Sequence, residues 1–442
     1  DNNLPTQPKN NQLTKKLIDL ALLIGVSWIA TMFVWNIVQE RESSQQGTAS
    51  LISEQWSRPQ LIAGPVLTIP MEKTIITTTG EKLITNDTLT LLPKNLTYTS
   101  DIKSQILTRG IYEAPVYTSI INGSGSFDLS VINLQPSENI KLLWGKAIVS
   151  INISDTRGID SNLSIDWNNK SYPLLPSSKF STLDENGVHA PIVIDGTNST
   201  YPFTFTLPLK GSREISFLPL SENTEVNLTS DWSTPSFTGE FLPKERNITE
   251  AGFSATWNIT SYGKNTPEYW LNNLNSVTRD FFAQKTFGVG LFQEVDFYTM
   301  IDRIMKYSIL FISLTFLTFF MYELLAGLRI HPMQYLLVGL AIALFYLLLL
   351  SFAEIVGFQI AYLISTIATT ILITGYCFSV LKAKKRAFSI TALLIALYGY
   401  LYILLQLEQF SLLFGSVLLF GVLAAVMYLT RNLDWYTLNN KE

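Results

Sequence analysis

Long apolar runs occur in two parts of the 442-residue chain, once near its N-terminus and then throughout its last third. A helix needs about 20 apolar residues to cross a hydrocarbon layer about 30 Å thick. Six windows reach this length, so the pattern predicts six transmembrane helices, at residues 17–38, 307–325, 333–352, 358–381, 388–407 and 410–429. The first window is longer than the apolar core of a signal peptide, which has about 7 to 15 residues, and we interpret it as an uncleaved anchor.

The region between the first two windows has a different pattern, in which apolar and polar residues alternate over short stretches. Residues 201–209, 149–153 and 253–260 all alternate in this way. Such alternation is typical of strands with one buried face, and the clusters NGSG (122–125) and DENG (184–187) predict turns. The sequence therefore predicts a large, mainly antiparallel, sandwich-like β domain. A helical face at its end leads into the second span and is formed by Phe297, Met300, Ile301, Ile304 and Met305.

Lysine and arginine near the spans indicate the orientation of the chain, because positive flanks are retained in the cytoplasm. They occur before the first span, between spans two and three, between spans four and five, and after the sixth: Lys9, Lys15, Lys16, Arg329, Lys382, Lys384, Lys385, Arg386 and Arg431. Arg303 and Lys306, outside the second span, do not fit this distribution. We predict a bacterial inner-membrane protein with cytoplasmic tails (1–16 and 431–442), an anchor (17–38), a periplasmic β domain (39–306) and a five-helix transmembrane block (307–430).

Charge and composition exclude several classes of site. The net charge is −4, and the one short cluster of basic residues lies in the loop at 382–386, so nucleic acid is not expected as a partner. Cys377 is the single cysteine, and the two histidines, His189 and His331, are far apart in the sequence. We therefore expect no disulfide, no histidine-based metal site and no cofactor, and we expect the lipid bilayer as the main partner.

Several stretches of this sequence resemble the CreD family of bacterial inner-membrane proteins. They are GPVLTIP (64–70), RGIYEAPVY (109–117), SDTRGI (154–159), FTGEFLP (237–243), FGVGLFQEVDFY (287–298) and the long segment 306–351. The resemblance implies a protein of cell-envelope integrity, produced under a two-component system and linked to stress response, colicin tolerance and the response to β-lactams. It implies no catalytic or ligand-binding residues.

Glu323 is the first candidate for a functional side chain, because a carboxylate in a membrane segment must pair, protonate or reach water. It lies six residues before Arg329, or about 9 Å along a helix axis, on the cytoplasmic side of the second span. Arg329, His331 and Pro332 form the predicted turn that follows. Glu323, Arg329 and His331 form a candidate polar site, for protons or for lipid headgroups; the alternative is a structural pair at the membrane surface.

Small residues recur in the fourth span, where they favour close contact between helices. The candidate helix-packing face consists of Ala361, Ser365, Ala368, Gly375 and Ser379. The threonines of the same span, Thr366, Thr370 and Thr374, are four residues apart, and the alternative to packing is a polar cavity that they line.

Four charged residues lie in the stretches of the β domain that resemble the family: Arg109, Glu113, Asp155 and Arg157. They form a candidate periplasmic site for a partner or ligand. The alternative is that they are solvated or pair with one another on the surface.

Three functions compete at this point. The first is a non-enzymatic envelope protein whose outer domain binds an envelope component, with an envelope protein or a second copy of the chain as partner. The second is a transporter or channel-like protein that uses Glu323 in a polar site, although Pro332 is the only proline after residue 267 and broken helices are typical of transporters. The third is a membrane-bound hydrolase of lipid or peptidoglycan, which needs convergent acids, since histidine and cysteine are scarce.

Overall fold

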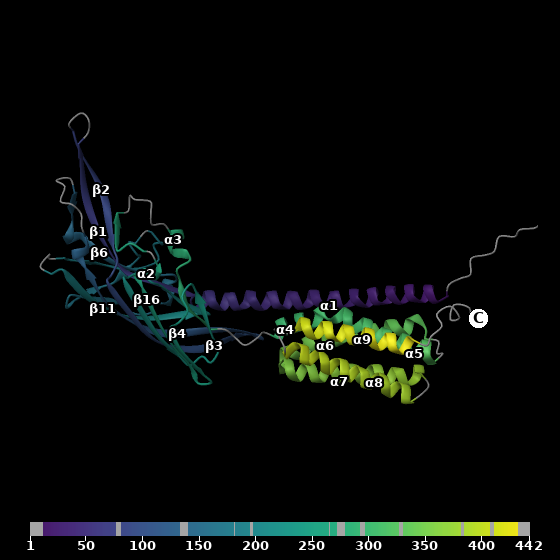
Figure 1. The fold of residues 1–442 in the computed structure, drawn as a ribbon. Helices are drawn as coiled ribbons and strands as arrows, with labels where there is room; N and C mark the ends of the chain where they lie inside the picture. The colour runs from purple at the N-terminus through teal and green to yellow at the C-terminus, as the bar shows by residue number, and fades with distance from the viewer. Residues whose placement is uncertain are drawn as a thin grey trace, which may run out of the picture. The chain divides into compact units, whose positions relative to one another are not determined.

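A computed structural model gives the fold of the chain (Figure 1). The structure describes the residues 12–76, 81–132, 140–180, 182–194, 198–264, 266–271, 279–291, 297–326, 330–381, 384–406 and 411–431. The chain forms two compact units, a membrane unit of residues 1–44 and 295–442 and a β unit of residues 45–294. The boundaries expected from the sequence are 38/39 and 306/307. The difference arises because helix α1 (Gln12–Trp56) continues past its apolar segment and a polar helix, α4 (Phe297–Lys306), precedes the second apolar segment.

The β unit contains two sheets. The first has ten strands, with β14-β18-β12-β1-β6-β10-β9 as its main order; β2 and β5 pair with β1, and β17 pairs with β2. Its strands are β1 (Gln60–Ile76), β2 (Lys82–Leu91), β5 (Ile140–Leu142), β6 (Ala147–Ile153), β9 (Leu175–Pro176), β10 (Gly187–Ile192), β12 (Glu214–Leu218), β14 (Pro235–Gly239), β17 (Tyr269–Leu271) and β18 (Phe287–Leu291).

The second sheet has eight strands in the order β15-β16-β13-β3-β4-β11-β7-β8. Its strands are β3 (Asn95–Arg109), β4 (Tyr112–Asp128), β7 (Ser164–Trp167), β8 (Lys170–Pro173), β11 (Thr200–Ser212), β13 (Asn223–Ser230), β15 (Glu245–Thr249) and β16 (Gly252–Thr260). Short helices connect strands in this unit: η1 (Leu129–Val131), η2 (Trp144–Lys146), η3 (Thr156–Gly158), α2 (Ser261–Lys264) and α3 (Arg279–Ala283).

The core of the β unit forms from the alternating apolar positions of both sheets. Tyr98, Trp167, Phe203 and Phe217 are each at most 1% exposed, and their rings join one buried cluster. Sheets packed face to face bury their inner side chains in this way, so the sandwich-like β domain is confirmed. Most strand pairs are antiparallel, as predicted, and two pairs, β1 with β12 and β3 with β13, are parallel.

The NGSG segment at 122–125 is not a turn; it lies inside strand β4. Gly123 and Gly125 face the core, where the aromatic rings of the neighbouring strand β11 lie over them. A Cβ atom on Gly123 would lie 2.2 Å from the Phe205 ring, and one on Gly125 would lie 2.1 Å from the Asn95 carbonyl oxygen and 2.8 Å from the Phe203 ring. The glycines are therefore explained by the close approach of atoms on neighbouring strands rather than by chain reversal.

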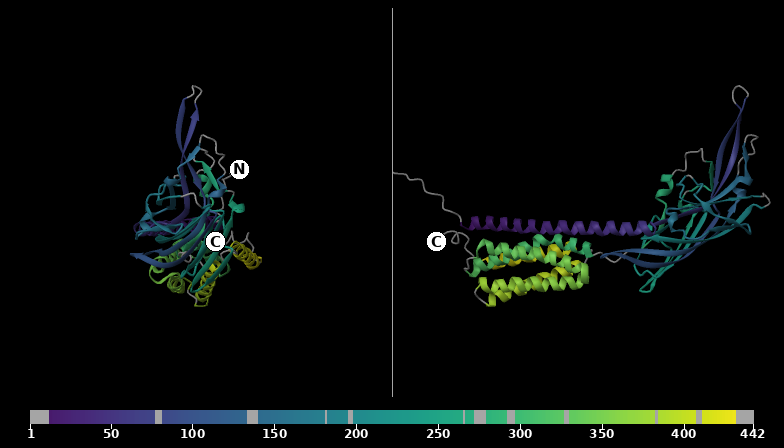
Figure 2. Two further views of the ribbon diagram at one scale, coloured as in Figure 1. Left: turned by 90° about the vertical axis from the view of Figure 1, so that its left-hand side faces the viewer. Right: turned by 180° about the vertical axis from the view of Figure 1, so that it is seen from behind.

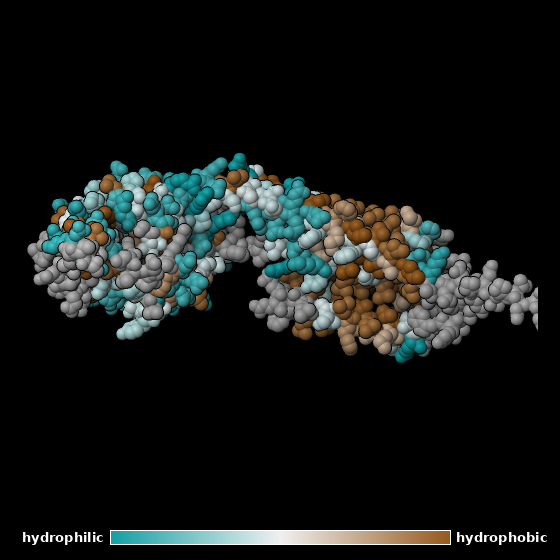
Figure 3. All heavy atoms as spheres, turned by 90° about the horizontal axis from the view of Figure 1, so that it is seen from above, coloured by the Kyte–Doolittle hydropathy of each residue, from teal (hydrophilic) through white to brown (hydrophobic). Residues whose placement is uncertain are grey.

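The membrane unit consists of residues 12–44 of α1 together with α4, α5 (Ser308–Ala326), α6 (Pro332–Val356), α7 (Phe358–Leu381), α8 (Lys384–Gln406) and α9 (Ser411–Thr430). Among the described residues, five helices are long and apolar enough to span a membrane, and α4 with α5 forms a sixth span if this pair, bent by 45°, is counted as one. The six predicted spans are therefore confirmed. The second predicted span corresponds to α5, which belongs to the bent pair of α4 and α5. The helices run side by side (Figure 2), and hydrophobic residues gather on their surface (Figure 3).

Candidate functional site

Glu323 lies near the C-terminal end of α5 and is only 8% exposed. Three groups from different parts of the membrane unit contact its carboxylate. The Lys16 ammonium group of α1 forms an ion pair with Oε1, to which the Ile330 backbone N–H also donates at 3.2 Å. The Tyr335 hydroxyl of α6 donates to Oε2 at 3.2 Å. The carboxylate is therefore neutralised and hydrogen-bonded, as a buried charge in a membrane helix must be.

His331, one of the two predicted partners of Glu323, makes other contacts. His331 is exposed and caps α6: its Nδ1 accepts from the Met333 N–H at 3.2 Å, and its own N–H donates to Gln334 Oε1 at 3.1 Å. Arg329 lies outside the described residues. Sequence reasoning missed Lys16 and Tyr335 as partners. Lys16 carried a usable signal, because it belongs to a positive flank that is expected on the same side of the membrane as Glu323.

A second polar cluster lies toward the opposite end of the membrane helices. Asp302 of α4 accepts hydrogen bonds from Trp35 Nε1 at 2.8 Å and Gln39 Nε2 at 3.3 Å, and pairs with Lys306 at 2.8 Å. Lys306, whose position does not fit the orientation rule, thus has a local acidic partner.

Glu354 of α6 belongs to the same end of the membrane unit. It accepts from the Tyr298 hydroxyl at 2.9 Å and lies 3.8 Å from the Arg41 guanidinium of α1. Lys16 and Arg41 are about 37 Å apart along α1 at about 1.5 Å per residue, slightly more than the thickness of a hydrocarbon layer. The two sets of ion pairs therefore flank one membrane-spanning length of α1.

The predicted packing face of α7 divides into two parts. Ala361 and Ser365 are fully buried, whereas Ala368, Gly375 and Ser379 are exposed in this chain. A line of buried residues at four-residue intervals runs along α7 instead: Ala361, Ser365, Thr369, Ile373 and Cys377. Phe358, Tyr362 and Thr370 are buried beside it. The members of the predicted face stay on one side of the helix, whereas positions four residues apart turn by about 40° at each step, so the two lines separate after Ser365.

Close helix packing through a small residue occurs in another place, between α1 and α6. A Cβ atom on Gly339 would lie 2.1 Å from Ser27 Oγ and 2.9 Å from the Phe316 ring, so only glycine permits this approach.

The threonines of α7, the predicted lining of a polar cavity, differ from one another in their hydrogen bonds. Thr374 exchanges a hydrogen bond with Thr391 of α8 at 2.8 Å, while Thr370 Oγ1 is buried without a partner among the described residues.

Asp155 in the β unit is 7% exposed and receives several hydrogen bonds. The Arg157 guanidinium donates to it through Nε at 2.9 Å and Nη2 at 2.7 Å, and the Arg58 N–H donates at 2.9 Å. The hydrogen bonds and charge of Arg157, with the backbone donors, outweigh burial and hold the pKa of the Asp155 carboxyl well below its usual range. Arg157 Nη1 also donates to the Glu54 carbonyl at 2.8 Å, so this pair joins the end of α1 to the turn after β6.

Arg109 and Glu113, the other two predicted members of this site, lie elsewhere. They are exposed at the end of the hairpin formed by β3 and β4, where Arg109 is paired with Tyr112 and Glu113 with Thr108 in the strand register. The structure therefore brings Asp155 and Arg157 together but gives Arg109 and Glu113 a separate position.

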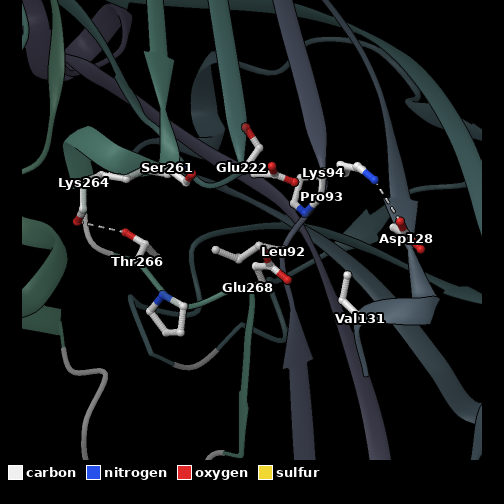
Figure 4. Close-up of a pocket in the computed structure, with 12 residues that line it drawn as sticks. Leu92, Pro93, Lys94, Asp128, Val131, Glu222, Ser261, Lys264, Thr266 and Glu268 are labelled. Carbon is white, nitrogen blue, oxygen red and sulfur yellow. Dashed lines mark hydrogen bonds and ion pairs between the residues drawn. The ribbon is translucent and has the colours of Figure 1, made fainter. Parts of the chain in front are cut away.

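A small cavity in the β unit contains charged groups that the sequence did not single out (Figure 4). Lys94 pairs with Asp128 at 3.1 Å on one side of it. Lys264 is 3% exposed and donates to the Pro219 carbonyl at 3.2 Å, and burial lowers its pKa to about 8. The cavity volume is about 20 Å³, close to the space that one water molecule needs, so it is too small for an organic ligand.

Comparison with known proteins identifies the family. A family model described as inner membrane protein CreD matches residues 12–436 of the chain. The inner membrane protein CreD of Escherichia coli (strain K12) is 32% identical over 412 residues, which cover 92% of this chain and 90% of that protein. The family match includes both units, the α1 segment with Lys16 and Arg41, and the helices with Glu323 and Glu354. The chain therefore belongs to the CreD family of inner membrane proteins.

Proposed function

We propose that this protein is a non-enzymatic inner-membrane protein that supports the integrity of the cell envelope, and that its β unit binds an envelope component. The observation that carries this proposal is the use of its buried charges. Glu323 is neutralised by Lys16, and Asp155 is held by Arg157 and backbone donors. A carboxylate engaged in this way positions helices and loops, and it is poorly available as a general acid, base or nucleophile.

The proposed orientation has both termini in the cytoplasm and residues 45–294 on the periplasmic side. The positive flanks at Lys15 and Lys16 support it, because such residues are retained in the cytoplasm. The length of α1 between Lys16 and Arg41 supports it further. It is sufficient for one crossing, after which the chain continues into the β unit.

The family membership supports the biological part of the proposal. The resemblance of this sequence to the CreD family implied envelope integrity, stress response and tolerance of colicins, and we extend these properties to the present chain as proposals. A periplasmic β unit of about 250 residues, with its own core, provides a large surface for a partner protein, a ligand or a second copy of the chain.

Deletion of the gene in its native host tests this function. We expect the deletion strain to take up more of a hydrophobic fluorescent dye and to survive envelope stress less well, and we expect the full-length protein to restore both. A variant truncated after residue 44 is inserted as an anchor alone and should not restore them. Unchanged dye uptake and survival in the deletion strain would contradict the proposal.

A further inference from the structure

The outer face of the eight-stranded sheet carries an ordered array of polar side chains, most of them uncharged. Cross-strand register aligns them in two rows, one across the six strands β7, β11, β4, β3, β13 and β16 and one across the last five of these. The first row is Asp166, Thr204, Ser124, Thr97, Glu225 and Asn258. The second row is Thr206, Asn122, Thr99, Asn227 and Thr256. None of these side chains is buried, and strands about 4.8 Å apart give the first row a length of about 24 Å.

One part of this array is hollowed into a groove. Its floor includes Thr99, Asn122, Thr204 and Thr206, and residues 161–164 before and at the start of β7 form part of its lining. The volume is about 410 Å³, within the range of about 300 to 1,000 Å³ that is typical of sites for small organic ligands. The groove belongs entirely to the β unit.

The chemistry of the lining restricts the ligand. Hydroxyl and amide groups both donate and accept hydrogen bonds, whereas ammonium groups only donate and carboxylates only accept. Asp166 is the one ionisable residue among the described lining residues, which include neither lysine nor arginine. Nucleic acids and other polyanions need cationic side chains, so they do not match this lining.

A protein matches the lining of the groove less well than a ligand with many hydroxyl groups does. The centres of protein interfaces are enriched in aromatic residues, methionine and arginine. Here the exposed lining is threonine, serine and asparagine together with Asp166, and the aromatic residue among the lining residues, Phe205, is 5% exposed on the core side of β11. Within the lining, Thr206 Oγ1 donates to Asn122 Oδ1 at 3.0 Å. This bond uses the Asn122 amide oxygen, so the amide nitrogen is the group of Asn122 that can donate to a ligand.

We propose that this groove binds a neutral sugar chain, whose hydroxyl groups exchange donor and acceptor hydrogen bonds with the two polar rows. The rows extend the contact beyond the groove, so a chain of several sugar units makes more hydrogen bonds than a single unit does. This inference names the ligand of the β unit and rests on the proposed function for the periplasmic location in which the ligand is met.

The test measures binding by the full-length protein in phospholipid nanodiscs, free of sugar-based detergents, by isothermal titration calorimetry or saturation-transfer NMR. The probes are two neutral tetrasaccharides, chitotetraose for N-acetylated amino-sugar chains and maltotetraose for glucose chains. A tetraglutamate peptide is the anionic probe. We expect at least one tetrasaccharide to bind and the peptide not to bind; which sugar binds identifies the source of the chain.

The double variant Thr99→Val and Thr206→Val replaces two hydroxyls of the groove by methyl groups of the same shape. We expect affinity to fall about tenfold or more, because each unmet hydrogen bond on the sugar is left desolvated. Ser124→Ala, a smaller change in the first row, should lower affinity in the same direction. Thr118→Val is the matched control, since Thr118 is exposed on β4 outside the groove, and it should bind as the unchanged protein does.

The inference is overturned if neither tetrasaccharide binds at about 10 mM, a concentration that detects even weak sites. It is also overturned if both groove variants bind as tightly as the unchanged protein while circular dichroism shows them folded. These outcomes are separate from those of the proposed function. A weakened envelope in the deletion strain without sugar binding rejects this inference alone, and sugar binding without any envelope defect rejects the proposed function alone.

Discussion

The Lys16 ammonium group on α1 and the Glu323 carboxylate on α5 form an ion pair between two helices, although the two residues are 307 positions apart in sequence. The carboxylate is 8% exposed and the lysine side chain is 37% exposed, so the carboxylate is buried among the helices and the lysine lies at their edge. It links the anchor helix to the C-terminal helical block, and the Tyr335 hydroxyl and Ile330 N–H complete the contacts of the carboxylate.

Substitutions of Lys16 and of Glu323 should therefore have unequal effects on the free energy of unfolding. Lys16→Met leaves Glu323 buried without its counter-charge and should lower the free energy of unfolding by about 1 to 3 kcal/mol. Glu323→Gln keeps one acceptor oxygen for the Ile330 N–H, and its NH2 group can donate to the Tyr335 hydroxyl, so it should cost less. The double variant should be more stable than Lys16→Met alone, since it removes the unpaired charge.

Thermal unfolding of the protein in nanodiscs, followed by tryptophan fluorescence, measures these differences. Lys15→Met is the matched control, because Lys15 is the exposed neighbour of Lys16, and it should leave the midpoint nearly unchanged. Equal midpoints for the Lys15 and Lys16 variants would show that the ion pair does not stabilise the membrane unit.

Asp155 should make the stability of the β unit depend on acid pH. Its folded-state pKa is lowered, chiefly by Arg157, so its stabilisation is fully present above the unfolded pKa of about 4 and is lost as the pH falls through the folded-state pKa. Asp155→Asn should therefore cost about 1 to 3 kcal/mol at pH 7, and the difference from the unchanged protein should shrink below about pH 4.

Chemical unfolding at a series of pH values provides the measurement. The comparison variant is Asp160→Asn, because Asp160 is also an aspartate with a basic partner, Lys210, but its side chain is 54% exposed. It should change stability much less than Asp155→Asn does, because a solvent-exposed ion pair contributes little. A cost for Asp155→Asn that stays constant from pH 7 down to the lowest accessible pH would contradict this account.

Gly123 should tolerate no side chain, because β4 passes directly under the Phe205 ring. Gly123→Ala would place a Cβ atom 2.2 Å from that ring, and we expect a loss of about 1 to 3 kcal/mol in the free energy of unfolding. Gly145 in η2 is the control, since no atom lies within 4 Å of an added Cβ. Gly145→Ala should stay within about 0.5 kcal/mol of the unchanged protein. Similar unfolding midpoints for the two variants would argue against the packing explanation.

Features that depend on local pattern could be predicted from the sequence, whereas features that depend on long-range contact could not. Apolar length predicts the membrane helices, and alternation such as that at residues 201–209 predicts the strands of the sandwich. The partner of Glu323 cannot be identified in this way, because Lys16 comes from a helix near the other end of the chain. The predicted turn at Gly123 is wrong for the same reason. The local sequence NGSG favours a turn, and only the ring of Phe205 on another strand explains the glycine.

Gly339 should be essential for the contact between α1 and α6 in the membrane unit. It meets Ser27, a fully buried residue of α1, so closely that an added Cβ would lie 2.1 Å from Ser27 Oγ. Gly339→Ala should separate the two helices locally and lower the unfolding midpoint, because small residues are what allow membrane helices to approach one another. The midpoint of thermal unfolding in nanodiscs, compared with that of the unchanged protein, measures this loss.

Gly375 on α7 provides the matched control for that experiment. It belongs to the predicted packing face, yet it is exposed and has no atom within 4 Å of an added Cβ. If contacts within this chain decide stability, Gly339→Ala is destabilised by about 1 to 3 kcal/mol and Gly375→Ala is unchanged. The opposite order would mean that the exposed small residues of α7, Ala368, Gly375 and Ser379, pack against a second copy of the chain, which cross-linking of the purified protein in nanodiscs would then detect as a dimer.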